Sequence, residues 1–227
     1  MKKLTLGLVL LAMATVNSAF ALEKAELDMR IQSLTTAFAE MQEKPDKNVP
    51  AEILAKAQGV ILLRRTKGGL VFGYQHGDGV AMVRDANGTW SAPAFMSDNE
   101  GSFGAQVGGE TSLFVILLMT TNSFSQLTDG KVQFTGEARG TIGDASTGQE
   151  GKMNDLPPVL VYSDRYGLFG GAAVKGGAVA PNPDADVVYY GKPITTREIL
   201  FDKKVKPGDA GTALAKKLTD CSKQAKR

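Results

Sequence analysis

Four basic side chains near the ends of predicted strands are the residues in this sequence best suited to bind an anion. Arg64, Arg65 and Lys67 follow the apolar run that starts at Val60, and Arg84 ends a later run. Arginine presents a planar fork of N–H donors that matches a phosphate group, and lysine presents a point charge. The sequence therefore predicts an anion site at these four residues. The alternative is that they are solvated ends of a β-hairpin.

Two phenylalanines could add an apolar part to a binding site. Phe95 and Phe103 flank a stretch of mostly polar residues and glycine, which we expect to form a loop. The two rings could line an apolar mouth. The alternative is that they belong to the core, as we expect for Trp90 and Phe114.

No combination of residues predicts catalysis, a metal or a cofactor. His76 is the single histidine, so a Ser-His-Asp or Cys-His arrangement would have to use it, and its place next to Gly77 is typical of a turn. That histidine and the single cysteine, Cys221, whose thiol we expect to face solvent, cannot supply a structural zinc site. Asn182–Asp186 resembles the start of a calcium loop, but Val187 stands where such a loop requires glycine. The glycines match neither a dinucleotide-binding nor a Walker motif.

The longest apolar run after the N-terminal segment predicts a strand inside the core. Leu113–Met119 is uninterrupted and follows four glycines between Gly101 and Gly109. This run is far shorter than the roughly 20 residues that a membrane-spanning helix needs. An apolar run of this length, bounded by a Gly-Gly pair and by polar residues, is typical of a strand buried on both faces. We predict that it is the central strand.

Strands dominate the middle of the chain and helices both ends, which predicts an α+β fold. The expected sheet is mostly antiparallel and glycine-rich, two-layered or barrel-like, and flanked by N- and C-terminal helices. Turn residues such as Asn87-Gly88 separate the strands. The predicted strands are Val60–Thr66, Leu70–Gln75, Val80–Arg84, Thr89–Ala94, Ser102–Val107, Thr111–Met119, Lys131–Ile142, Val159–Ser163 and Leu168–Ala173. The predicted helices are Leu22–Glu43, Ala51–Gln58, a short helix capped by Asn122 or Ser123 that continues to Leu127, Asp184–Tyr190, Thr196–Phe201 and Asp209–Ala225.

The first predicted helix has one apolar stripe at steps of three or four residues. Its members are Leu27, Ile31, Leu34, Phe38 and Met41. A helix that lies on an anionic membrane should carry Lys and Arg on its polar face. This helix and its C-terminal end carry instead five acidic against three basic residues. We therefore expect the stripe to pack against the domain.

Residues 1–21 have the three parts of a secretory signal peptide. Lys2 and Lys3 precede the apolar Leu4–Val16, and Ala19-Phe20-Ala21 forms an A-x-A cleavage site. We expect cleavage near Ala21 and a mature protein that is periplasmic or secreted. The remaining boundaries divide the chain into an N-terminal helix and linker (22–49), a domain (50–192) and a C-terminal helical extension (193–227).

The charge balance argues against nucleic acid as a partner. The chain has 26 Lys and Arg against 24 Asp and Glu, and two of the lysines lie in the signal peptide. The mature chain is then neutral overall. A nucleic-acid-binding domain carries a basic excess, so this class of protein is disfavoured.

Several sequence blocks occur in the order of a known family. They include Gly77–Arg84 (GDGVAMVR), Trp90–Phe95 (WSAPAF), Gly101–Gly108 (GSFGAQVG) and Tyr189–Lys192 (YYGK). In this order they resemble the SYLF lipid-binding domain family, over roughly Ala51–Lys192. The resemblance implies binding of membrane lipids, which are phosphoinositides in the eukaryotic members, with actin contacts in some. It implies no established catalysis.

Two functional hypotheses follow from the residues and the resemblance together. The first is a secreted, non-enzymatic protein of the cell envelope that binds a phospholipid or membrane surface, with Arg64, Arg65, Lys67 and Arg84 as ligands of anionic headgroups. The second is a periplasmic scaffold that binds an envelope protein and has no lipid ligand. Neither hypothesis involves a cofactor or nucleic acid. Vesicle binding distinguishes the two.

Overall fold

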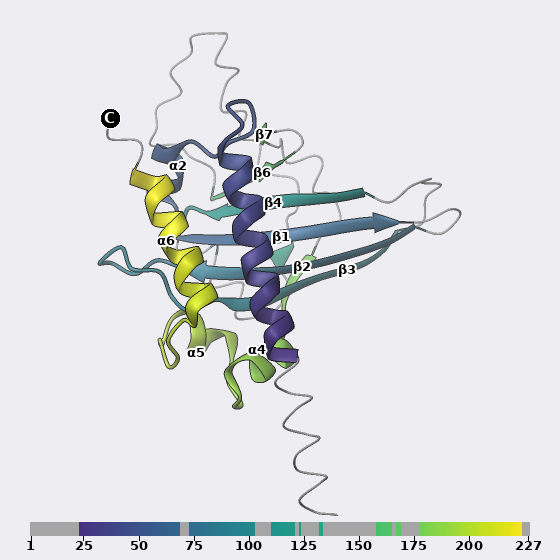
Figure 1. Cartoon of the computed structure of the whole chain (residues 1–227), viewed down its shortest axis with the longest axis vertical. Helices are drawn as coiled ribbons and strands as arrows, with labels where there is room; N and C mark the ends of the chain where they lie inside the picture. The colour runs from purple at the N-terminus through teal and green to yellow at the C-terminus, as the bar shows by residue number, and fades with distance from the viewer. Residues whose placement is uncertain are drawn as a thin grey trace, which may run out of the picture.

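The computed structural model describes residues 23–68, 73–102, 110–120, 123, 132–133, 158–164, 167–168 and 178–223. They form an α+β fold in which two long helices lie across a sheet (Figure 1). The first helix, residues 23–42, is drawn in purple, and the last, α6 (Asp209–Lys223), in yellow. The fold class predicted from the sequence is confirmed.

The sheet is antiparallel and open. Its strands follow the order β5-β8-β3-β2-β1-β4-β6-β7, and each pair of neighbours is antiparallel in the part of the chain that is described. The two ends of this order do not join, so the sheet is not closed and the barrel-like form of the prediction does not hold. The strands are β1 (Gly59–Gly68), β2 (Gly73–Val83), β3 (Ala94–Ser102), β4 (Glu110–Leu118), β5 (Val132–Gln133), β6 (Val159–Ser163), β7 (Gly167–Leu168) and β8 (Ala178–Pro181).

Three shorter helices lie between the two long ones in the described part of the chain. They are α2 (Ala51–Lys56), α4 (Pro183–Tyr190) and α5 (Thr196–Leu200). The side chain of Asn182 accepts a hydrogen bond from the Ala185 N–H at the start of α4, and Gly191 ends that helix with a φ of 65°. Thr195 and Glu198 form a capping box at the start of α5. Apart from the short helix predicted through Leu127, which lies largely outside the described residues, the predicted helices agree with the structure to within two residues. In α4 and α5 these local signals account for the agreement.

Strand β4 is buried on both of its faces, as the apolar run predicts. Leu113, Val115 and Leu117 face the core beneath the long helices, and Ile116 and Leu118 face a second core on the other side of the sheet. The alternation follows from the period of two along a strand. The strand is internal but not central, because it lies between β1 and β6 while β1 and β2 occupy the middle of the order.

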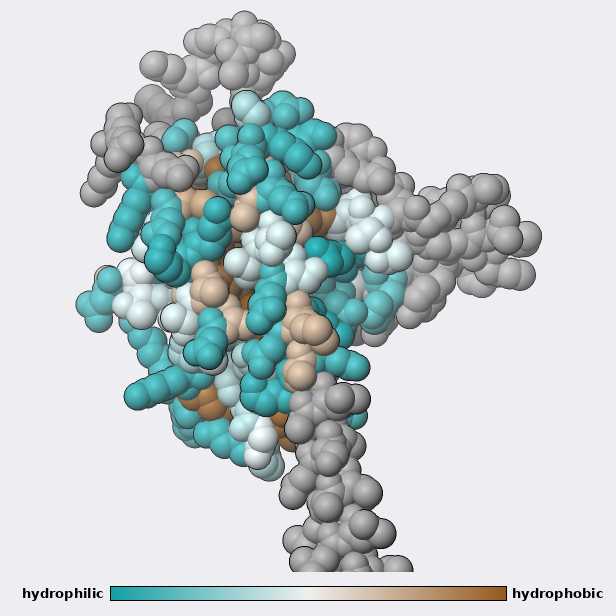
Figure 2. Space-filling view, in the orientation of Figure 1, coloured by the Kyte–Doolittle hydropathy of each residue, from teal (hydrophilic) through white to brown (hydrophobic). Residues whose placement is uncertain are grey.

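The first core lies between the sheet and the two long helices. The predicted stripe of the first helix is confirmed, since its five members are all buried here: Leu27, Ile31, Leu34, Phe38 and Met41. Leu214 and Leu218 of α6 pack in the same core. The outer surface of this helical layer is mostly hydrophilic (Figure 2). The first helix therefore packs against the domain, as its acidic polar face suggests.

The second core covers the opposite face of the sheet. Ile61, Leu63, Ile116 and Val161 contribute from the strands, and Ile199 contributes from α5. Each of these strand residues neighbours a residue that faces the first core. The inner strands are therefore apolar on both faces, which explains their nearly continuous hydrophobic sequences.

Strand β3 departs from the prediction. The sequence predicts a strand over Thr89–Ala94 and a loop after it, whereas β3 starts at the end of that range and continues to Ser102. Before β3, the Ser91 N–H donates to the Val83 carbonyl oxygen at 2.8 Å, and the Ser91 side-chain oxygen accepts from the Val83 N–H at 3.1 Å, so only an isolated bridge between Arg84 and Trp90 forms there. The polar residues after Phe95 pair with β2 along its length. The expected loop is therefore a strand.

The thiol of Cys221 is buried, so the prediction that it faces solvent is wrong. Cys221 is 3% exposed and lies in the first core. It follows Leu214 by seven residues and Leu218 by three, which places all three on one face of α6. Burial raises the pKa of the Cys221 thiol.

A buried carboxyl group joins β3 to α4 and α5. Asp186 is fully buried and accepts a hydrogen bond from the Phe95 N–H at 2.8 Å and one from the Thr196 hydroxyl at 3.4 Å. Loss of solvation raises the pKa of Asp186 to about 7, although both hydrogen bonds oppose the rise. The carboxyl group therefore titrates near neutral pH.

Candidate functional site

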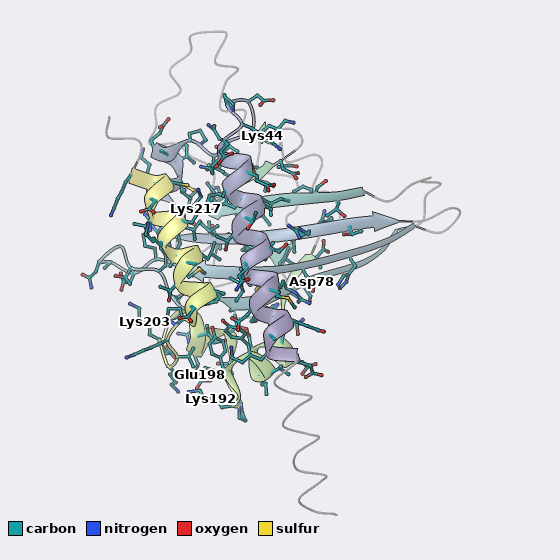
Figure 3. All side chains as sticks on the ribbon, in the orientation of Figure 1. Lys44, Asp78, Lys192, Glu198, Lys203 and Lys217 are labelled. Carbon is teal, nitrogen blue, oxygen red and sulfur yellow. The ribbon has the colours of Figure 1, made fainter. Side chains whose placement is uncertain are left out.

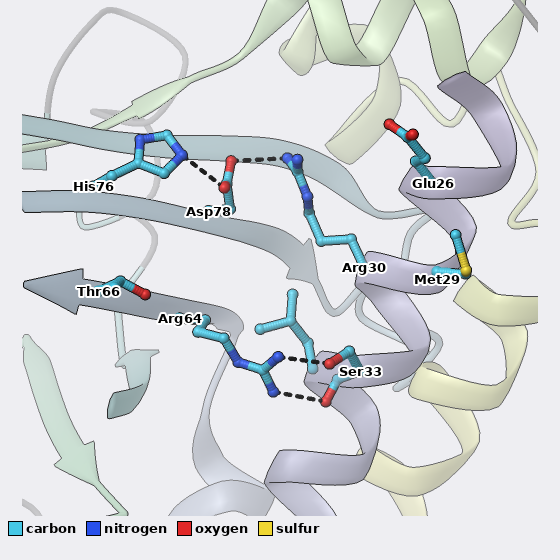
Figure 4. Close-up of a pocket in the computed structure, with 9 residues that line it drawn as sticks. Glu26, Met29, Arg30, Ser33, Arg64, Thr66, His76 and Asp78 are labelled. Carbon is cyan, nitrogen blue, oxygen red and sulfur yellow. Dashed lines mark hydrogen bonds and ion pairs between the residues drawn. The ribbon is translucent and has the colours of Figure 1, made fainter. Parts of the chain in front are cut away.

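A groove separates the first helix from the ends of β1 and β2. It has a volume of about 340 Å³ and is shown in Figure 4. The helix supplies five of its lining residues and the two strands supply four: Glu26, Met29, Arg30, Ser33, Leu34, Arg64, Thr66, His76 and Asp78. A groove of this size is within the range of small-ligand sites in proteins.

Helical and strand periodicity bring these residues together. Glu26, Arg30 and Ser33 are spaced by four and three residues, so they lie along one side of the helix. On the sheet, Arg64 pairs with Asp78 across the two strands, and the next row on the same face is Thr66 with His76. The groove thus lies between the polar side of the helix and two rows of residues on strands β1 and β2.

Two sets of polar contacts cross the groove. Arg30 Nη1 lies 2.8 Å from Asp78 Oδ1, and His76 Nε2 lies 2.7 Å from Asp78 Oδ2. Arg64 donates from Nη1 to the Ser33 hydroxyl at 2.6 Å and from Nη2 to the Ser33 carbonyl oxygen at 3.2 Å. Figure 4 shows both arginines bridging the helix and the strands. These contacts hold the two guanidinium groups in place.

The groove combines two positively charged arginine side chains with apolar side chains at its rim. A guanidinium group has five N–H donors, and in the described structure the contacts above use one donor of Arg30 and two of Arg64. Donors thus remain to face an anion. Met29 is 58% exposed on the same side of the helix, and Leu34 also lines the groove. An amphiphilic anion would meet both kinds of surface.

Of the four predicted basic ligands, Arg64 lines the groove but Arg65 lies on the opposite face of the sheet. Arg65 Nη2 is 2.5 Å from Asp98 Oδ2, and the two side chains are 6% and 0% exposed. Gly77 pairs with both residues across β2, and a Cβ atom there would lie 2.9 Å from the Asp98 Cβ. The glycine leaves room for this ion pair. Arg65 is therefore a buried structural residue rather than a surface cation.

Arg84 is also engaged within the fold. It donates to the carbonyl oxygens of Ala55 at 2.8 Å and Leu54 at 3.4 Å, at the end of α2, and its guanidinium group lies 4.4 Å from the centre of the Trp90 ring. Partial burial lowers the pKa of Arg84. The side chain of Lys67 lies outside the described residues. The structure therefore does not gather the four predicted ligands into one site.

The predicted apolar mouth at Phe95 is wrong. Phe95 is fully buried in the first core, and its ring meets the Tyr189 ring edge-on with a centroid distance of 5.1 Å. The reason is that β3 places this residue inside the sheet instead of at a loop. Phe103 lies outside the described residues.

Sequence reasoning missed Arg30, Ser33 and Asp78 as groove residues. The helical spacing of Arg30 and Ser33 could have placed them on one edge of the helix. No local signal shows that this edge faces Asp78, because that contact joins residues far apart in the chain. His76, which the sequence analysis places at a turn next to Gly77, lies instead within the continuous strand β2 and lines the groove.

The described ranges contain neither a metal-binding cluster nor a helix suited to span a membrane. Within the described ranges, no three His, Cys, Asp or Glu side chains lie close enough to hold a metal ion. Among the same residues, no helix has the length and apolar character that crossing a membrane requires.

The family model and the relatives found by comparison with known proteins point to the same family. The model of the Ysc84 family, described as "Las17-binding protein actin regulator", matches residues 99–221. The chain is 31% identical to Protein YSC84 of Saccharomyces cerevisiae over 71% of its own length and 36% of the yeast protein. It is 29% identical to LAS seventeen-binding protein 3 of the same yeast, over 68% of this chain and 35% of that protein.

A human relative has a similar identity to this chain and is likewise matched over only part of its length. SH3 domain-containing YSC84-like protein 1 of Homo sapiens is 27% identical over 73% of this chain and 49% of the human protein. The chain thus spans about a third to a half of the length of these relatives. No solved structure matches it.

Proposed function

Because this chain belongs to the Ysc84 (SYLF) family, we propose that it is a non-enzymatic binding protein of the cell envelope that holds the headgroup of an anionic phospholipid. The headgroup occupies the groove between the first helix and strands β1 and β2. The observation that carries this proposal is that one groove contains both apolar side chains at its rim and two arginines held in place by contacts between the helix and the strands.

The chemistry of the groove suits a phosphate diester attached to an apolar chain. Arg64 and Arg30 offer N–H donors to the phosphate oxygens, and hydrogen bonds that involve ionised groups are the stronger class. Asp78 forms its ion pair with Arg30, and Glu26 also lines the groove. Arg64 contacts only the uncharged Ser33, so it supplies the positive charge that no ion pair neutralises among the described residues. Met29 at the rim would contact the first carbons of the lipid.

Removing both arginines is expected to weaken lipid binding. The variant Arg30→Gln/Arg64→Gln should bind vesicles of phosphatidylglycerol and phosphatidylcholine at least tenfold more weakly than the wild type, because each charge-assisted hydrogen bond contributes about 1.5–3 kcal/mol. Co-sedimentation measures the binding, and Trp90 fluorescence reports whether the fold is kept.

Lys216→Gln/Lys217→Gln serves as the matched control, since it removes two positive charges from α6, away from the groove residues. This control should bind as the wild type does. Equal binding by the arginine variant and the wild type would refute the groove as the headgroup site.

A protein ligand is the second candidate function. It is favoured by the description of the family and by the name of LAS seventeen-binding protein 3, both of which refer to binding of Las17. Under this alternative the wild type does not bind vesicles of any composition, and the groove accepts a peptide side chain in place of a headgroup. Absence of vesicle binding by the folded wild type would therefore support the protein-interaction module.

Location in the envelope is part of the proposal and rests on residues 1–21. The A-x-A sequence at Ala19–Ala21 supports cleavage by a signal peptidase. The intact mass of protein purified from the envelope fraction is expected to correspond to a chain that begins at Leu22. A mass that includes residues 1–21 would contradict it.

A further inference from the structure

A second surface of the molecule carries a concentrated positive charge. Residues 192–206, here called the basic segment, contain five basic and two acidic residues, whereas the whole chain has a formal net charge of only +2. The basic members are Lys192, Arg197, Lys203, Lys204 and Lys206, and all five are exposed. Figure 3 shows Lys192 and Lys203 in this region, near α5. None of them lines the groove.

The backbone of the basic segment is held rigidly. Ile199 and Leu200 are buried in the second core, and Phe201 packs against it. The Lys204 N–H donates to the Glu198 carbonyl oxygen at 3.0 Å, which closes the turn after α5. The capping box described above fixes the start of the same helix. The cations are therefore presented on a preorganised backbone.

Part of the positive charge is not neutralised within the fold. Lys203 pairs with Asp85, and Lys204 pairs with Glu198 at 2.6 Å. Lys192, Arg197 and Lys206 have no ion-pair partner among the described residues; the Lys192 ammonium donates to a backbone carbonyl oxygen at 3.4 Å. The exposed Asp202 offsets one of the three. The basic segment therefore keeps a net positive charge.

The basic segment lacks the apolar centre that protein interfaces need. The exposed large hydrophobic residues among those described are Met29 and Val187, and neither belongs to the segment. Protein–protein interfaces depend on buried aromatic or aliphatic anchors at their centre. Adsorption to an anionic bilayer needs only positive charge near the headgroup layer. The chemistry therefore favours a membrane surface over an acidic protein.

We propose that the basic segment docks the protein onto the surface of an anionic bilayer, as a contact additional to the groove. This inference rests on the proposed lipid binding, and it names the surface that faces the membrane. Three unpaired cations near an anionic leaflet should together strengthen binding by roughly tenfold to a hundredfold at low salt. Screening shortens the range of the attraction to about 10 Å at 0.1 M salt.

The test compares two triple variants on vesicles. Lys192→Gln/Arg197→Gln/Lys206→Gln removes the unpaired cations, and Lys216→Gln/Lys217→Gln/Lys223→Gln removes the same charge from α6. The first should bind phosphatidylglycerol vesicles tenfold to a hundredfold more weakly than the wild type in 50 mM salt, and the second within about threefold. The difference should shrink in 0.5 M salt. A soluble short-chain phosphatidylglycerol should bind all three proteins equally, because it needs only the groove.

Each contrary outcome has a definite meaning. Equal losses in both triple variants would show general electrostatic attraction and overturn the proposal. So would a first variant that binds vesicles normally but no longer binds polyglutamate, which would assign the segment to an acidic protein. A wild type that binds neither vesicles nor the short-chain lipid would overturn the proposed function itself. A wild type that binds both, alongside an unimpaired first variant, would overturn only the docking surface.

Discussion

Replacing Asp98 by leucine is expected to lower the free energy of unfolding by about 3–5 kcal/mol, because Arg65 would be left charged and buried without its counter-ion. Both side chains are almost fully buried, and their ion pair spans β2 above Gly77. The double variant Arg65→Met/Asp98→Leu should recover most of the loss, since an apolar pair of similar size needs no solvation. Urea unfolding followed by Trp90 fluorescence measures both effects.

A surface ion pair provides the comparison for this prediction. Lys216 and Asp220 are 75% and 48% exposed, and Asp220→Leu should change the stability by no more than about 1 kcal/mol. A cost below 1 kcal/mol for Asp98→Leu would show that the buried pair is not fixed as described.

The burial of Arg65 also affects tests of lipid binding. Charge reversal at Arg65 would abolish binding through unfolding, so Arg30 and Arg64 are the informative positions.

The stability of the protein is expected to fall as the pH rises from about 4 to about 7 because of Asp186. Its pKa is about 7 in the folded protein against 3.8 for an ordinary aspartate. The folded state therefore keeps a proton that the unfolded state releases, so stabilisation is complete below pH 4 and is lost as the pH passes 7. A difference of about three pKa units corresponds to up to about 4 kcal/mol.

Asp186→Asn isolates this effect. The amide oxygen can still accept the hydrogen bond from the Phe95 N–H, and the amide does not titrate. Glu198, whose pKa is lowered to about 2 by Lys204 and Thr195, gives a slope of the opposite sign at lower pH, but it is the same in both proteins. Thermal unfolding between pH 4 and pH 8 should show a smaller decline for the variant. Parallel curves would rule out Asp186 as the titrating group.

The sequence predicts those parts of the fold that depend on neighbouring residues. The apolar stripe of the first helix follows from the period of its hydrophobic residues, and the doubly buried strand β4 follows from its uninterrupted apolar run. Both are confirmed. The short helices follow from capping residues such as Asn182 and Thr195. Periodicity could also have placed Cys221 beside Leu218, had it been applied to α6.

The candidate site depends on contacts between distant residues, which local patterns do not reveal. Strand alternation is enough to separate Arg64 from Arg65, but not to show that one meets Ser33 and the other Asp98. The basic segment was overlooked for another reason. Its cations alternate with buried residues over a short helix and a turn, so they do not form a continuous run of charge.

The first core also constrains the order in which the chain can fold during synthesis. The helix at residues 23–42 leaves the ribosome early and α6 leaves it late, yet Phe38 and Leu218 belong to one core. The apolar stripe of the early helix therefore stays partly uncovered until nearly the whole chain has been made. A product shortened before α6 should therefore expose this stripe and aggregate rather than fold.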